Sequence, residues 1–237
     1  MPLEGSKKFS VIIPVYNEEG YIKLAIIALK NQNLPRQDFE IIVVDNNSND
    51  ATAEVAKNAG ADKVVKELKQ GTNMARQRGF LESRGKIVAF LDADSKPPID
   101  WLTKIKKILL QKDVAAVSGP FDYQFQGFKK ILDFIYVHFI LSYLDKFLYF
   151  FFRKKAGVII GGNFAAWRWA IEKIGGLPPL KFFGDDAAIA MLLSREAGKV
   201  IFTPQLKVIS SQRRFEKQGF LKLAFKYARS YLKIYFS

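Results

Sequence analysis

The strongest constraint on the fold is an alternation of two hydrophobic patterns through the first half of the chain. Short apolar segments predict strands, and each is followed by a longer segment with helical periodicity. Strands that alternate with helices of about ten or more residues predict βαβ units, so we expect an α/β fold of the open, mostly parallel type with helices on both faces. The predicted strands are 9–15, 39–44, 62–66, 86–91 and 114–118, and the predicted helices are 18–31, 50–58, 72–83 and 98–111.

The pattern changes after residue 118. A long apolar and aromatic stretch without Gly or Pro covers 128–152. Helices are predicted at 167–174, 185–196 and 219–235, and strands at 199–202 and 206–210. We expect one domain with two lobes, a first half (1–118) and a second half (119–210) that carries the apolar helical insert at 128–152, followed by a basic amphipathic C-terminal helix (211–237).

Two carboxylates, Asp92 and Asp94, follow the predicted strand 86–91 and are separated only by Ala93. In an open α/β sheet, ligands bind in the crevice beyond the carboxyl ends of the strands. A hard divalent ion prefers carboxylate oxygens and keeps positions open for phosphates. The pattern therefore predicts a metal–diphosphate site, with solvated turn acids as the alternative.

Polar residues also stand at the ends of other predicted strands. Pro14 and Tyr16 suit the wall of a ligand crevice, whereas Asn17 has the side chain of a helix cap and Glu19 suits a helix N-terminus. Asp45 ends the second strand, where it is placed to accept hydrogen bonds from a base or a ribose, although residues 48–50 also offer helix caps.

Three further charged motifs each have a functional and a structural interpretation. Arg76 lies near a predicted helix start, which favours an anion site, but a solvated face is the alternative. Asp185 and Asp186 begin a helix, so one is a candidate general base and one a helix cap. The adjacent Arg213 and Arg214 are placed to neutralise a leaving diphosphate or to form a surface cluster, and the single histidine, His138, is expected to be structural.

Composition excludes several classes of protein. The chain has 237 residues and no cysteine, so disulfide frameworks and thiolate metal sites are absent. GxGxxG does not follow the first strand and GxxxxGK[ST] occurs nowhere, so dinucleotide binding and P-loop hydrolysis lack their usual signals. The net charge of +14 favours anionic partners such as phosphorylated substrates, acidic membranes or nucleic acid.

The order of these motifs resembles that of the family 2 glycosyltransferases with the GT-A fold. The resemblance is carried by VIIPVYNEE, VVDNNSND, GTNMARQRG, VAFLDAD, GGNFAAWR and FGDDAAIAMLLSREAG. It implies a nucleotide-sugar donor with Mg²⁺ or Mn²⁺ on its diphosphate, Asp94 as the principal metal ligand, and Asp92 as a ribose or metal contact. It also implies that Asp45 and Arg76 hold the base and that Asp186 is the general base. On this resemblance, residues 1–118 form the nucleotide-sugar-binding half and residues 119–210 the acceptor-binding half. Expected donor-side residues are Pro14, Tyr16, Glu18, Asp45, Asn47, Arg76, Asp92 and Ala93; expected acceptor or leaving-group residues are Gly162, Asn163, Gln212, Arg213 and Arg214.

Three positions depart from the family pattern. Asn46 stands where many members have a second aspartate, and Asp185 replaces the Glu of the family's Glu-Asp pair. Residues 212–215 are similar to the QxxRW motif of processive members, but Phe215 replaces the tryptophan, so processive polymerisation is not expected.

The resemblance predicts an inverting transfer of sugar to an acceptor hydroxyl, because a single base suffices for direct displacement. A polyprenyl-phosphate sugar synthase is the alternative within the family. A nucleotidyltransferase on a similar sheet would need a glycine- and lysine-rich signature near the N-terminus, which this sequence lacks. The acidic strand tips argue against a nucleic-acid-binding protein.

The second half also suggests a membrane surface. The insert 128–152 contains internal charges that disfavour a membrane span. Basic residues recur at helical spacing between Lys222 and Lys233, as in helices that lie on anionic lipid, although packing on the core is the alternative. With no secretory signal in the first eight residues, we expect a protein on the cytoplasmic face of the membrane with a lipid-linked or membrane-associated glycan as its acceptor.

Overall fold

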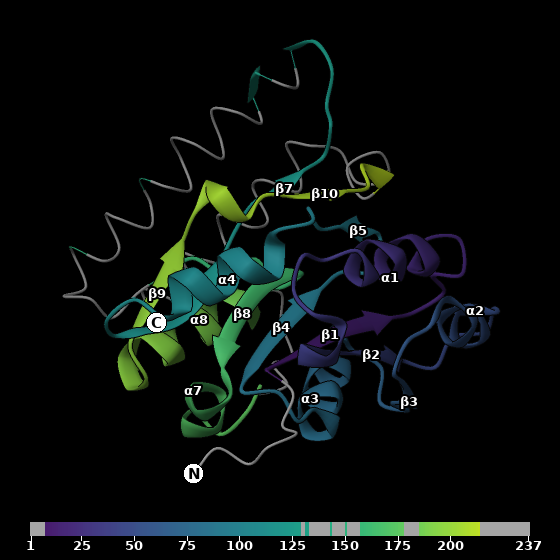
Figure 1. Ribbon diagram of the computed structural model, residues 1–237, viewed down its shortest axis with the longest axis horizontal. Helices are drawn as coiled ribbons and strands as arrows, with labels where there is room; N and C mark the ends of the chain where they lie inside the picture. The colour runs from purple at the N-terminus through teal and green to yellow at the C-terminus, as the bar shows by residue number, and fades with distance from the viewer. Residues whose placement is uncertain are drawn as a thin grey trace.

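A seven-stranded sheet forms the centre of the computed structural model, which describes residues 8–128, 131, 132, 143, 150, 157–177 and 185–213. Its strand order is β3-β2-β1-β4-β8-β6-β9, from right to left in Figure 1. Only β8 runs antiparallel to its neighbours, so the predicted mostly parallel sheet is confirmed. The strands are β1 (Phe9–Val15), β2 (Phe39–Asp45), β3 (Lys63–Lys66), β4 (Ile87–Leu91), β6 (Val114–Ser118), β8 (Asn163–Trp167) and β9 (Lys199–Phe202).

Helices cover both faces of this sheet. Successive side chains of a strand point to opposite faces, and in β1 Val11 and Ile13 pack into one apolar cluster while Ile12 packs into another. The first cluster includes residues of α1 (Ile22–Lys30), α2 (Thr52–Ala59) and α4 (Trp101–Leu109). The second includes residues of α3 (Thr72–Glu82), α7 (Arg168–Lys173) and α8 (Asp185–Glu196). Burial on both faces explains why the strands have continuous apolar sequences.

A second, three-stranded sheet joins the end of β4 to the later part of the chain. It consists of β5 (Ser95–Lys96), β10 (Val208–Ser210) and β7 (Phe121–Asp122), in the order β5-β10-β7. Figure 1 shows this small sheet above the large one. Because β5 follows Asp94 directly, the residues after β10 are brought next to the acidic turn.

The structure corrects three local predictions. The first helix begins at Ile22 and not at residue 18, because the backbone N–H groups of Glu18 and Glu19 bond to Thr52 and Asp50 in the neighbouring loop. Asn17 does not cap this helix; its side chain accepts from the Asn49 N–H. β8 was not predicted, since its alanine-rich sequence lacks a strand signal. Two short 3₁₀ helices, η1 (Arg36–Asp38) and η3 (Pro204–Leu206), also occur, and η3 shortens the strand predicted at 206–210.

Most of the insert 128–152, including His138, and residues 214–237 lie outside the described residues. Within the described part of the chain, none of the helices has the length and apolar character needed to span a membrane.

Candidate functional site

The acidic turn after β4 lies at the carboxyl end of the strand, as predicted. The Asp92 N–H donates to the Gly162 carbonyl at 3.0 Å, and the Ser95 N–H donates to the Asp92 carbonyl at 3.1 Å. Ala93 between the two acids is buried. These bonds fix the turn against the large sheet and the small one, so Asp92 and Asp94 are held by the backbone at the carboxyl end of β4.

Arg76, a buried residue of α3, links Asp92 to Asp186. Its Nη2 lies 3.7 Å from Asp92 Oδ1, and its Nη1 lies 3.3 Å from Asp186 Oδ1. Asn73 accepts from the same Nη1 at 3.1 Å. The Asp186 carboxylate also accepts from the Gly161 N–H at 2.9 Å. One guanidinium thus brings together carboxylates from the two halves of the chain.

Gly161 and Gly162 leave room for this cluster. A β-carbon on Gly161 would overlap the Asp186 carboxylate and the Arg76 guanidinium, and one on Gly162 would overlap the Asp92 carboxylate. Glycine therefore allows the backbone to pass directly beside the charged groups. The prediction that Gly162 belongs to the acceptor side stays a prediction, but its place against Asp92 is a structural fact.

The pKa of the Asp185 carboxyl is raised from 3.8 to about 6. Burial is the largest cause and the negative charge of Asp186 adds to it, whereas Arg76 acts in the opposite direction. Its Oδ1 is buried and has no hydrogen-bond partner among the residues that the structure describes. Asp185 therefore holds a proton to a higher pH than an ordinary aspartate.

This raised pKa has a measurable effect on stability. Between about pH 4 and 6 the folded chain binds the Asp185 proton more tightly than the unfolded chain, so this group makes stability fall as pH rises through that window. We expect Asp185→Asn to gain melting temperature relative to the wild type as pH rises from 4 to 7. Thermal melts at a series of pH values measure this, and parallel curves for the two proteins would contradict the prediction.

Arg213 connects the residues after β10 to the acidic turn. Its Nε lies 3.0 Å from Asp94 Oδ2, and its Nη2 forms a short ion pair with Glu18 Oε1. The guanidinium carbon also lies 4.5 Å from the centre of the Tyr21 ring. Burial raises the pKa of the Glu18 carboxyl, although the hydrogen bond and charge of Arg213 oppose this. The sequence placed Glu18, Asp94 and Arg213 around the same diphosphate, but it did not predict the direct ion pairs between them.

The side-chain amide of Asn46, a residue that departs from the family pattern, organises the end of β2. Asn46 donates to the carbonyls of Glu67 and Lys69 and accepts from the Gly71 N–H. Asp45 accepts from the Ser48 N–H at 3.1 Å. Asn46 therefore connects the tip of β2 to the start of α3, beside the predicted donor residues.

The remaining predicted donor residues line this edge of the sheet. Pro14 lies near the end of β1, and Tyr16 is 47% exposed just beyond it. Asn47 has a left-handed backbone with φ of 68°. Arg76 pairs with Asp92 and Asp186, and joint binding of the base by Asp45 and Arg76 stays a prediction.

Asn163 has a structural role within the fold, and its predicted place on the acceptor side stays a prediction. It is buried, its Nδ2 donates to the carbonyls of Gly119, Pro120 and Leu206, and its Oδ1 accepts from Trp101 Nε1 at 3.0 Å. With its whole amide used by the protein, Asn163 holds β8 to α4 and to the chain after β6.

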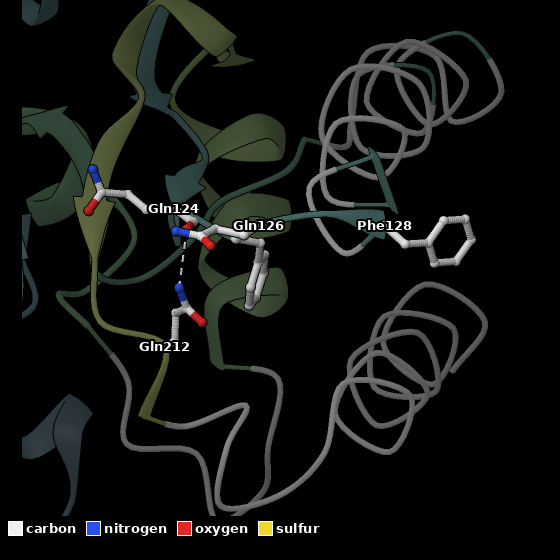
Figure 2. Close-up of a pocket in the computed structure, with 5 residues that line it drawn as sticks. Gln124, Gln126, Phe128 and Gln212 are labelled. Carbon is white, nitrogen blue, oxygen red and sulfur yellow. Dashed lines mark hydrogen bonds between the residues drawn. The ribbon is translucent and has the colours of Figure 1, made fainter.

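Gln212 lines a cavity of about 430 Å³ beyond the small sheet. Its Nε2 donates to the Gln124 carbonyl at 3.3 Å, which ties the chain after β10 to the chain after β7. Figure 2 shows Gln212 reaching toward Gln124, with the Phe128 ring apart from the amides. The described lining residues are Gln124, Phe125, Gln126, Phe128 and Gln212, none of which is charged.

Comparison with known proteins defines the class of this chain. Residues 10–175 match the model of glycosyl transferase family 2, so the chain belongs to that family, and its architecture is the GT-A fold. The solved mannosyltransferase PcManGT from Pyrobaculum calidifontis, in complex with GDP-Man and Mn²⁺, is 25% identical with a TM-score of 0.71, over 87% of this chain and 57% of that one.

Two curated relatives extend the comparison. The probable glycosyltransferase YdaM of Bacillus subtilis (strain 168) is 31% identical over 197 residues, which are 77% of this chain and 44% of YdaM. A Campylobacter jejuni GalNAc(5)-diNAcBac-PP-undecaprenol beta-1,3-glucosyltransferase is 36% identical over 95 residues, which are 38% of this chain and 30% of that enzyme. The matched regions thus span less than half the length of these relatives.

Proposed function

We propose that this chain carries the catalytic site of an inverting, metal-dependent glycosyltransferase that moves a sugar from a nucleoside-diphosphate sugar to an acceptor hydroxyl. The observation that carries the proposal is the convergence of Asp92, Asp94 and Asp186 at the carboxyl end of β4, with Arg76 between two of them. The crevice at this end is where open α/β sheets bind ligands. The structural relative bound to GDP-Man and Mn²⁺ supports a donor of this kind.

The carboxylate oxygens of the acidic turn suit Mg²⁺ or Mn²⁺ as ligands. Mg²⁺ sites commonly use one or two carboxylates, with phosphates and water completing the coordination. In the described part of the chain no group of three or more His, Cys, Asp or Glu side chains forms a metal site by itself. We therefore assign Asp94, with Asp92, as the protein ligands. When bound, the ion would stabilise the negative charge that develops on the leaving diphosphate.

Asp186 is our candidate for the general base that removes the proton of the acceptor hydroxyl. The Arg76 guanidinium and the Gly161 N–H hold its carboxylate on the side facing Asp92. A base placed opposite the leaving group supports direct displacement with inversion, through an oxocarbenium-like transition state. Asp185 is the second candidate, because its free oxygen and raised pKa also suit proton transfer.

On the donor side we assign Pro14, Tyr16, Glu18, Asp45, Asn47 and Arg76 to the nucleotide, with Asp92 and Ala93 beside the diphosphate. On the acceptor side we assign the region that contains Gly162, Gln212, Arg213 and Arg214. The uncharged, amide-rich lining of the cavity at Gln212 favours a neutral, hydroxyl-bearing group. A relative that acts on an undecaprenol-linked saccharide supports a lipid-linked or membrane-associated glycan, and hence a peripheral position at the cytoplasmic face of the membrane.

A panel of nucleotide sugars, titrated calorimetrically with and without Mn²⁺, tests the proposal. We expect one donor to bind the wild type, and to bind it more tightly when Mn²⁺ is present. In Asp94→Asn the metal should give no such gain in affinity. Nucleic acid is not an expected partner, and tight oligonucleotide binding without any donor binding would contradict the proposal. Transfer to a polyprenyl phosphate in place of a hydroxyl would identify the alternative synthase.

A further inference from the structure

We propose that Arg213 occupies the position of the divalent cation when the chain is free of metal, and that metal binding displaces it. The inference rests on the proposed function in one respect, that Asp94 binds a divalent cation. The guanidinium bridges Asp94 and Glu18, two acids separated widely in the sequence, through its Nε and Nη2 atoms. A single positive group thus stands where two acidic side chains converge.

Burial explains why these carboxylates need a cation at all times. The side chains of Glu18 and Asp94 are each 14% exposed, whereas that of Arg213 is 32% exposed. Two carboxylates that are largely removed from water and close to each other repel one another unless a positive group lies between them. Arg213 supplies this charge in the metal-free chain, and the Tyr21 ring supports its guanidinium from one side.

A metal ion bound to Asp94 and this guanidinium compete for Asp94 Oδ2. Mg²⁺ binds carboxylate oxygen at about 2.0–2.1 Å and demands near-ideal octahedral geometry, which the bond from Arg213 Nε to Asp94 Oδ2 obstructs. Glu18 Oε2 is buried without a hydrogen-bond partner in the described part of the chain. When Arg213 leaves, Glu18 Oε1 is also released, and both oxygens of this carboxylate become available to the metal ion or to its bound water. Arg213 therefore lowers the apparent affinity for metal and stabilises the metal-free chain.

Displacement of Arg213 would also change the position of the residues next to it in the chain. Gln212, the preceding residue, lines the cavity described above and bonds to the Gln124 carbonyl. If the guanidinium leaves Asp94, the chain after β10 loses its anchor on the acidic turn. Metal occupancy is therefore coupled to the position of Gln212, and a ligand in that cavity should bind differently with and without metal.

Mn²⁺ binding to the whole chain, without any donor, tests this inference. We expect Arg213→Gln to bind Mn²⁺ on the order of tenfold more tightly than the wild type, measured by calorimetry and by the electron paramagnetic resonance signal of free Mn²⁺. Without metal the variant should melt at a lower temperature than the wild type, and Mn²⁺ should raise its melting temperature by more. Arg213→Lys, which keeps the charge but loses the planar fork, should lie between the two.

Lys207→Gln is the matched control. It also removes one positive charge next to the small sheet, but Lys207 pairs with Asp122 at 2.9 Å and does not pair with Asp94. Its Mn²⁺ affinity should equal that of the wild type. Mn²⁺ binding that is lost in Asp94→Asn but equal or weaker in Arg213→Gln would overturn this inference and leave the proposed function standing. Absence of Mn²⁺ binding from both the wild type and Arg213→Gln would overturn both.

Discussion

Replacement of Asp94 by asparagine is expected to abolish sugar transfer while leaving the fold intact. The carboxylate is assigned as the principal metal ligand, and a metal ion contributes several kcal/mol of stabilisation to a developing charge. The expected loss in kcat/KM is therefore at least about 10³. The side chain stands in a turn at the end of β4 and contacts Ser210 and Arg213, so the substitution creates no cavity in the apolar core.

Asp100→Asn is the control for this substitution. Asp100 is a half-buried acid that pairs with Lys104 within one helix turn, so its loss should leave the transfer rate unchanged. Circular dichroism and thermal melts would establish that both variants fold. Transfer by Asp94→Asn at the wild-type rate in the presence of Mn²⁺ would refute the assignment of the metal site.

Replacement of Asp186 by asparagine is expected to lower kcat by on the order of 10²–10⁴, the usual range for loss of a general base, with donor binding retained. Asp185→Asn should have a smaller effect, because Asp186 is the carboxylate that the Arg76 guanidinium and the Gly161 N–H hold in place. Steady-state rates of both variants, together with calorimetric donor binding, measure the difference. Asparagine keeps the size of the side chain, and its one oxygen can still accept from the Gly161 N–H, whereas the ion pair with Arg76 is lost.

The relative losses in the two variants identify the base. A larger loss in Asp185→Asn would make Asp185 the base and Asp186 its positioning residue through Arg76. A parallel fall of donor binding and rate in Asp186→Asn would instead make Asp186 a donor ligand. A loss below about tenfold in both variants, with a phosphate acceptor, would favour the polyprenyl-phosphate synthase, because a phosphate needs little help from a base.

The sequence predicted those parts of the fold that depend on local pattern. Apolar segments such as 39–44 became strands buried on both faces, and the helix predicted at 185–196 has the bounds of α8. The position of Asp92 and Asp94 at a strand end was also predictable, because the apolar sequence before them is a complete strand signal. The strand β8 was missed because two of its five residues are alanine and it pairs antiparallel in an otherwise parallel sheet.

Contacts between distant segments could not be predicted from one sequence. The pairing of Arg76 with Asp186 and that of Arg213 with Glu18 join residues with no shared local pattern. The likeness to QxxRW is also only partial: two residues separate Gln from Arg in that motif, whereas Arg213 alone separates Gln212 from Arg214. The tertiary contacts of Arg213 therefore say more about this segment than the motif did.

Transfer from a nucleotide sugar, followed by nuclear magnetic resonance of the new glycosidic bond, tests the central claim most directly. The donor that binds in the calorimetric panel would be incubated with Mn²⁺ and with a hydroxyl acceptor. We predict that the donor is consumed only when metal is present and that the anomeric configuration of the product is opposite to that of the donor. Transfer that persists in excess chelator, or a product that retains the donor's configuration, would contradict the account.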